Sequence, residues 1–276
     1  MKIAIVTDST SDLTEEEAQQ NNIQIIPAIL VMNGQQYLDG RGISREEFYE
    51  RLPIQNPPPT TASPSSGMFS EVYRNLFEQG FEQIVSVHIA SPLSGIVNAA
   101  RVAAEHFGGR VQVVDSGQLS LGLGYQALAA AKSALSGSLQ QVHAAIESVQ
   151  QRVRVIAMLD TLEQLKRSGR ISWLRTSLGS ILRIKLFVEV RDGSVLRLGE
   201  SRTRQKGIQR LSEMLAALGP LEQLTIGHTN ALQDAVELAE KFAPQVNTAP
   251  LIRNVTTVIG THIGVRGLGF IAVKAE

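Results

Sequence analysis

Short apolar runs rich in β-branched residues alternate with amphipathic stretches of helical period through the first 159 residues of the chain. The runs that we interpret as buried strands begin with Ile3–Val6 and end with Val153–Leu159, and most of them are followed by a segment with helix signals. Parallel strands need a long crossover, which is usually a helix. The alternation therefore predicts an α/β fold whose N-terminal part is a parallel sheet with helices on both faces.

The pattern changes after residue 160. Ile184–Val190 and Ser194–Leu198 flank the turn dipeptide Asp192-Gly193, which predicts an antiparallel hairpin. A chain of 276 residues has room for one large domain or two modest ones. We therefore predict an N-terminal α/β domain over residues 1–157 and a C-terminal mixed α/β domain with the antiparallel hairpin over residues 158–276.

Composition excludes several classes of protein. The 26 basic and 26 acidic residues balance, so the molecule as a whole is not built to bind nucleic acid. Without cysteine it has no disulfides, no thiolate metal site and no cysteine nucleophile. The N-terminal apolar run stops at Asp8, and we find neither a signal sequence nor a transmembrane segment, so a cytoplasmic location is expected.

Two hydroxyl-rich loops, Thr60–Gly67 and Ser91–Gly95, each precede a predicted helix. Serine and threonine at such positions either cap the helix or, together with backbone N–H groups, hold an anion. We expect both loops at the C-terminal edge of one parallel sheet, which is where open α/β sheets bind ligands. Because no activated nucleophile accompanies them, the pattern favours holding an anion over transforming it.

Three further motifs are ambiguous by themselves. His262 stands in the glycine-rich stretch Gly260–Gly267, where it has either a binding or a structural role. Asp8 and Asp12 fit turn closure better than metal binding, since no other carboxylates cluster with them. Gly122–Gly124 lacks the tight strand-to-helix turn of a dinucleotide site and indicates close helix packing.

The segment from Lys166 to Arg210 is strongly basic, with twelve lysines or arginines against three acidic residues. Such a run is either a solvated face or the docking surface for an acidic or phosphate-bearing partner. Trp173 and Phe187 are its only aromatic residues, so single-stranded nucleic acid is not the expected partner.

Eight short motifs follow one another along nearly the whole chain: Thr7–Leu13, Asp39-Gly40, Thr61–Ser65, Ser91–Gly95, Asp115-Ser116, Leu165–Ile171, Arg202–Lys206 and Gly260–Gly264. Taken together, in this order and at this spacing, they resemble the DegV family. The resemblance implies a two-domain α/β lipid carrier that is not an enzyme on its own, needs no cofactor and binds a long-chain, palmitate-like fatty acid. In FakB-like members a separate fatty acid kinase subunit then phosphorylates the carboxyl group.

Residue by residue, the resemblance implies that Thr61 and Ser94 bind the carboxylate and that His262 lies near the head group. It further implies partner or phosphate contacts from the basic motifs, which contain Arg170, Arg202, Arg204 and Lys206.

The sequence departs from the family pattern at three places. Ala62 stands where the family has a hydroxyl, and Ile96 replaces a threonine. Val265-Arg266 replaces Pro-Gly, which brings the charge of Arg266 near the site or swings it outward.

Two other functions stay open on the residues alone. One is a serine hydrolase that uses Ser94, His262 and a carboxylate such as Asp8, although the nucleophile-elbow motif is missing. The other is a phosphate-dependent transferase whose basic segment holds the phosphates.

Overall fold

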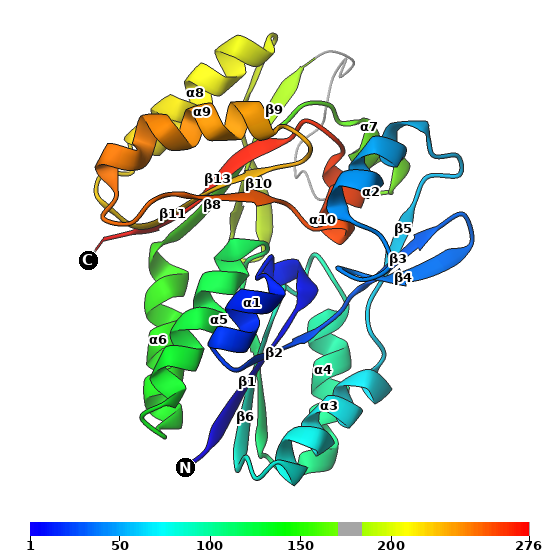
Figure 1. Cartoon of the computed structure of the whole chain (residues 1–276), viewed down its shortest axis with the longest axis vertical. Coiled ribbons are helices and arrows are strands. Elements are labelled where there is room, and N and C mark those ends of the chain that lie inside the picture. Colours follow the sequence, from blue (N-terminus) through cyan, green and yellow to red (C-terminus); the bar gives the residue numbers. More distant parts are fainter. Residues whose placement is uncertain (171–183, 276) are drawn as a thin grey trace. The chain divides into compact units, whose positions relative to one another are not determined.

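The computed structural model of the chain describes residues 1–170 and 184–275 and divides into two compact units (Figure 1). The first unit comprises residues 1–29 and 62–151, and the second comprises residues 30–61 and 152–276. The sequence prediction placed residues 30–61 in the first domain, whereas the contacts place them in the second unit. The tri-proline of residues 57–59 lies close to the second crossing, but a local pattern does not show which unit a segment packs against.

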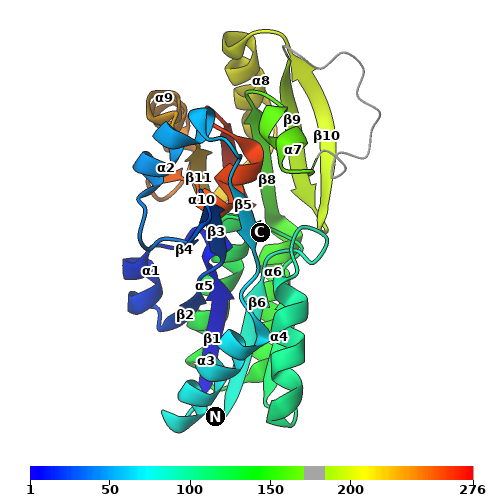
Figure 2. The ribbon, with the colours of Figure 1, turned by 90° about the vertical axis from the view of Figure 1, so that its right-hand side faces the viewer.

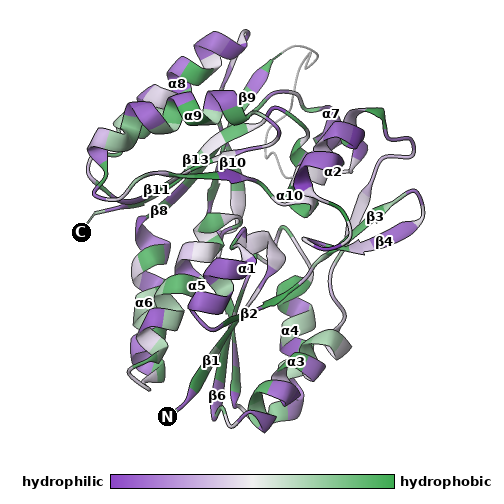
Figure 3. Cartoon of the chain, in the orientation of Figure 1, coloured by the Kyte–Doolittle hydropathy of each residue, from purple (hydrophilic) through white to green (hydrophobic). Residues whose placement is uncertain are grey.

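The first unit contains a fully parallel four-stranded sheet in the order β2-β1-β6-β7. This confirms the predicted N-terminal parallel sheet. Every residue of β1 is buried, as the apolar run Ile3–Val6 indicates for a strand of a parallel sheet, and the strand is hydrophobic along most of its length (Figure 3). The strands are β1 (Ile3–Asp8), β2 (Ile23–Ile26), β6 (Gln83–His88) and β7 (Val111–Asp115).

Helices cover both faces of this sheet, with α1, α5 and α6 on one side and α3 and α4 on the other (Figure 1). A capping box starts α1, because Thr14 Oγ1 accepts from Glu17 N at 3.0 Å and the Glu17 carboxylate accepts from Thr14 N at 2.8 Å. The helices are α1 (Glu15–Gln20), α3 (Ser66–Glu78), α4 (Ile96–Ala104), α5 (Leu121–Ala134) and α6 (Leu139–Arg152).

Helix α5 begins at Leu121, because the preceding Ser120 adopts a positive φ of 52° that is incompatible with a helix. Ser94 does not cap α4, whose N-cap is Gly95. Its hydroxyl instead accepts a hydrogen bond of 3.4 Å from Ile96 N.

The second unit contains a six-stranded mixed sheet in the order β10-β9-β8-β13-β11-β12, in which only β11 and β12 pair in parallel. The predicted antiparallel hairpin is confirmed as β9 and β10 (Figure 2). Asp192 and Gly193 at its turn both have positive φ, 47° and 72°, as a two-residue primed turn needs. The strands are β8 (Val153–Leu159), β9 (Lys185–Arg191), β10 (Ser194–Ser201), β11 (Leu221–His228), β12 (Leu251–Asn254) and β13 (Leu268–Lys274).

Two long helices, α8 and α9, build the main core of this unit against the sheet, around Met158, Phe187, Phe242 and Phe270. Among the residues described, no helix is both long enough and apolar enough to cross a membrane. The helices of the unit are α2 (Arg45–Arg51), α7 (Glu163–Arg167), α8 (Arg204–Ala216), α9 (Leu232–Phe242) and α10 (Thr257–Ile263).

A small three-stranded sheet has the order β4-β3-β5. The chain passes from the first unit to the second within β3 and returns to the first unit within β5. The segment between them has a core of its own that includes Leu30, Phe48 and Tyr49. This core fixes the segment whose last residue is Thr61. The strands are β3 (Ile29–Met32), β4 (Gln35–Leu38) and β5 (Thr60–Ala62).

Candidate functional site: a hydroxyl–imidazole pair and a serine loop

Two of the predicted site residues, Thr61 and His262, meet in the second unit. Thr61 lies half-buried in β5, and His262 lies in the last turn of α10 with 8% of its surface exposed. Thr61 Oγ1 is 3.0 Å from His262 Nε2, which is hydrogen-bonding distance between residues 201 positions apart. The fold thus couples the hydroxyl to the imidazole.

His262 is a neutral imidazole at neutral pH. Burial lowers its pKa to about 4, and the positive charge of Arg170 acts in the same direction. In the tautomer with a proton on Nε2, the ring donates to Thr61 Oγ1, and the threonine proton then points to another acceptor. The pair can therefore present a hydrogen-bond donor to an anion without a buried positive charge.

The lowered pKa has a consequence for stability. A histidine whose pKa falls from 6.5 to about 4 on folding stabilises the native state above pH 6.5, and this contribution is lost as the pH falls toward 4. We expect the wild type to lose about 3 kcal/mol more unfolding free energy than His262→Gln between pH 7 and pH 4, measured by urea denaturation. Equal pH slopes for the two proteins would contradict the buried neutral imidazole.

The glycine-rich stretch that contains His262 begins inside a helix, α10, which the sequence pattern did not indicate. Gly260 lies inside α10, where a Cβ would come within 2.3 Å of Tyr49 Oη. The glycine thus permits close contact between α10 and a buried tyrosine rather than flexibility. Gly264, with a φ of 79°, ends the helix.

Ser94 lies in the first unit, half-buried in the loop that follows β6. Its hydroxyl is 3.4 Å from the hydroxyl of Ser63. The loop is anchored by Asp115, which accepts from Ser91 N at 3.2 Å and from Gly117 N at 3.0 Å. This loop is at the C-terminal edge of the parallel sheet as predicted.

The other hydroxyl-rich loop does not follow that prediction. Thr61 belongs to β5 of the small sheet and follows no strand of the parallel sheet. Further along the same loop, Ser65 is the N-cap of α3 and accepts from Met68 N at 3.3 Å. In this loop Ser65 therefore caps the helix, whereas Thr61 is left as the candidate for binding an anion.

Asp8 has the structural role that the sequence favoured. One carboxylate oxygen accepts from Thr10 N at 3.0 Å, and the other accepts from Ile89 N at 3.1 Å and lies 3.0 Å from His88 Nδ1. The opposite ring nitrogen of His88 is 2.7 Å from Ser86 Oγ, in a network that is fully buried. Both oxygens of Asp8 are thus occupied within the first unit. No cluster of three metal-binding side chains occurs among the described residues.

The predicted partner-facing cations differ in their surroundings. Arg204 is largely buried and forms ion pairs with Asp160 at 2.9 Å and with Asp234 at 2.5 Å, which indicates a structural role for its charge. Arg202 and Lys206 are exposed, and Arg266 is 59% exposed with its Nε 3.8 Å from Asp160. Arg170 donates to Ser168 O at 2.9 Å, whereas two other basic residues of the segment, Arg175 and Arg183, lie outside the described residues.

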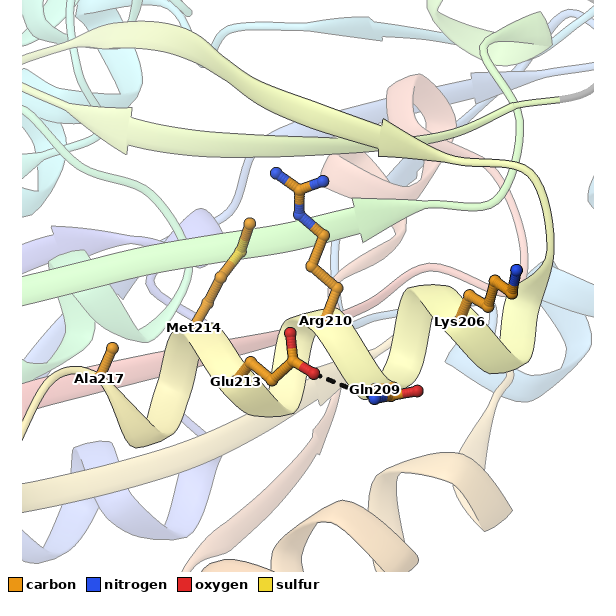
Figure 4. Close-up of a pocket in the computed structure, with 6 residues that line it drawn as sticks. All are labelled: Lys206, Gln209, Arg210, Glu213, Met214 and Ala217. Atoms are coloured by element: carbon orange, nitrogen blue, oxygen red, sulfur yellow. Dashed lines mark hydrogen bonds between the residues drawn. The ribbon is translucent and has the colours of Figure 1, made fainter.

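A surface pocket of about 620 Å³ runs along α8, and two cations of the basic segment, Lys206 and Arg210, line it (Figure 4). Arg210 extends from the helix toward the hairpin and donates to Leu198 O at 3.4 Å, while Gln209 donates to Glu213 at 3.1 Å. The lining residues are Lys206, Gln209, Arg210, Glu213, Met214 and Ala217.

Comparison with known proteins places the chain in a family. Residues 2–275 match the family model described as "Uncharacterised protein, DegV family". A DegV domain-containing protein of Listeria innocua is 32% identical over 277 residues, which cover 98% of each chain. The chain therefore belongs to the DegV family, as its motifs predicted.

Solved structures of similar chains agree with the fold. A DegV family protein from Thermus thermophilus, described for its fatty acid binding, has a TM-score of 0.91 at 30% identity and is covered completely in both directions. DegV from Bacillus subtilis, described as a fatty acid binding protein, has a TM-score of 0.88 at 29% identity, with 99% of this chain and 100% of that chain covered. The predicted two-part α/β architecture is thus confirmed.

Proposed function

We propose that this protein binds a long-chain, palmitate-like fatty acid and holds its carboxylate with Thr61 and Ser94, close to His262. The observation that carries the proposal is the hydrogen bond between Thr61 and the buried, neutral His262. The similar chains from Thermus thermophilus and Bacillus subtilis, both described as binding fatty acid, support the choice of ligand.

The apolar tail and the charged carboxylate of a fatty acid contribute differently to the free energy of binding. Each buried methylene contributes roughly 0.8 kcal/mol, so a sixteen-carbon tail contributes on the order of 10 kcal/mol before entropy costs. A hydrogen bond to the charged head contributes roughly 1.5–3 kcal/mol. The tail therefore dominates affinity, while Thr61 and Ser94 set the depth and orientation of the carboxylate.

The proposal extends to a partner. Phosphorylation of the carboxylate needs a nucleotide and Mg²⁺, and a separate fatty acid kinase subunit would supply both. The exposed cations Arg202, Lys206 and Arg266 are the candidates for contacts with that subunit or with the nucleotide phosphates, joined by Arg170 near the imidazole. In this role the chain is a carrier in the cytoplasm and not an enzyme on its own.

Removing either hydroxyl is expected to weaken binding of the acid selectively. Thr61→Val or Ser94→Ala should each raise the Kd of delipidated protein for palmitate about tenfold or more, because a hydrogen bond to the charged head is lost. The Kd for methyl palmitate, which has no carboxylate, should stay within about twofold. Titration calorimetry with both ligands measures this selectivity.

Thr60→Val is the matched control for Thr61→Val, since Thr60 is an exposed neighbour on the same strand. It should leave both dissociation constants unchanged. If neither Thr61→Val nor Ser94→Ala alters palmitate binding, or if acid and ester weaken equally, the carboxylate site lies elsewhere. The two enzyme alternatives gain no specific support from the described residues.

A further inference from the structure

The first turn of α10 is held by a carboxylate from a distant part of the second unit. Asp39 Oδ1 accepts from the hydroxyl of Thr257 at 2.8 Å, and Asp39 Oδ2 accepts from the hydroxyl of Thr256. All three residues are buried, with Asp39 6% exposed and the two threonines 1% exposed. A buried, charge-assisted contact of this kind fixes position strongly because water cannot replace it.

The contact replaces the usual helix cap. Thr256 is the N-cap residue of α10, yet its side chain does not cap the helix and donates to Asp39 instead. A carboxylate at the start of a helix also interacts favourably with the positive end of the helix dipole. The position of α10 therefore depends on Asp39 rather than on a local cap.

A second contact holds the middle of the same helix. Tyr49 Oη donates to Val255 O at 2.7 Å, and its ring lies so close to Gly260 that no side chain fits there. Asp39 and Tyr49 both belong to the segment of residues 30–61, whose last residue is Thr61. The segment of residues 30–61 thus supplies the Thr61 hydroxyl and also contacts α10, the helix that carries the His262 imidazole.

We propose that Asp39 is a positioning residue for the carboxylate site: through Thr256 and Thr257 it sets α10 so that His262 meets Thr61. His262 lies five residues after Thr257, about 7.5 Å along the helix, so a tilt at the first turn displaces the ring directly. This inference rests on the proposed function, since it assigns Asp39 a part in binding the fatty acid head.

The test compares acid and ester binding in Asp39→Asn. The amide keeps the shape of the carboxylate but loses its charge and one acceptor. We expect the Kd for palmitate to rise about tenfold while the Kd for methyl palmitate changes less than about twofold. Glu189→Gln is the matched control, because Glu189 is a buried carboxylate of the same unit whose partners are Arg154 and Arg191. It should not change the ratio of the two constants.

Thr257→Val removes one hydrogen-bond donor to Asp39 and leaves the charge of Asp39 in place. This variant provides the test if Asp39→Asn fails to fold. It should lower the preference for the acid, and Thr257→Ser, which restores the hydroxyl, should recover it. A purely structural role would weaken acid and ester equally or lower only the melting temperature, and either result overturns the proposal.

The wild type and Thr61→Val separate this inference from the proposed function. If the wild type prefers the acid and Thr61→Val loses that preference, while Asp39→Asn and Thr257→Val keep it, only the positioning role of Asp39 fails. A wild type with no preference for the acid overturns the proposed function, and the positioning role falls with it.

Discussion

Arg204→Ala is expected to lower the free energy of unfolding by roughly 3 kcal/mol. The guanidinium is 15% exposed and lies between Asp160 and Asp234, which are 12% and 30% exposed. It also donates to Arg266 O at 2.7 Å. Removing it leaves two partly buried carboxylates with one cation fewer, which costs more than a surface ion pair contributes. Urea denaturation at neutral pH measures the change.

Lys206→Ala is the matched control, because Lys206 is exposed on the same helix two positions along. It should change stability by less than about 0.5 kcal/mol. The resemblance to the family suggested a partner or phosphate contact for Arg204, and its ion pairs indicate a structural role. If Arg204→Ala unfolds as the wild type does, within about 1 kcal/mol, the ion pairs contribute little and that structural role is wrong.

Gly124→Ala is expected to destabilise the protein by about 2 kcal/mol, although alanine is the better helix former by about 1 kcal/mol. A Cβ at this position in α5 would lie 2.6 Å from the backbone oxygen of Ser11 and 2.7 Å from the side chain of Leu121. A backbone oxygen cannot swing aside as the end of a flexible side chain can. Thermal unfolding followed by circular dichroism measures the effect.

The exposed Gly67 of α3 provides the comparison, since the nearest atom to a Cβ there is 3.6 Å away. Gly67→Ala should be neutral or stabilising. A stabilising effect of Gly124→Ala would show that α5 does not pack as closely on the first unit as the structure has it.

The regular elements could be predicted because their signals are local. The alternation that begins at Ile3 predicts the parallel sheet, and Asp192-Gly193 predicts the hairpin turn. The sequence did not predict α10, because threonine and glycine residues interrupt the apolar repeat that is typical of a helix. The helix is also stabilised by Asp39, which lies more than two hundred positions earlier in the chain. Long-range stabilisation of this kind leaves no mark in the local sequence.

The candidate site likewise combines residues that the sequence identified with long-range contacts that it did not reveal. Thr61 and His262 were singled out separately, and only the resemblance to the family joined them in one site before the structure brought them within hydrogen-bonding distance. The sequence did not reveal the positioning contacts of Asp39 and Tyr49, although the motif Asp39-Gly40 was visible. The ion pairs of Arg204 join residues 44 and 30 positions apart, so the sequence did not show that this arginine of the basic segment is paired within the fold.

The most direct measurement is lipid extraction from the full-length protein after expression in a heterologous host. The purified protein is denatured, extracted with organic solvent and analysed by mass spectrometry beside an unrelated protein prepared in the same way. We predict an equimolar amount of long-chain fatty acid, released as the free acid. A preparation that carries no fatty acid and also fails to bind added palmitate would contradict the proposal that this chain is a fatty acid carrier.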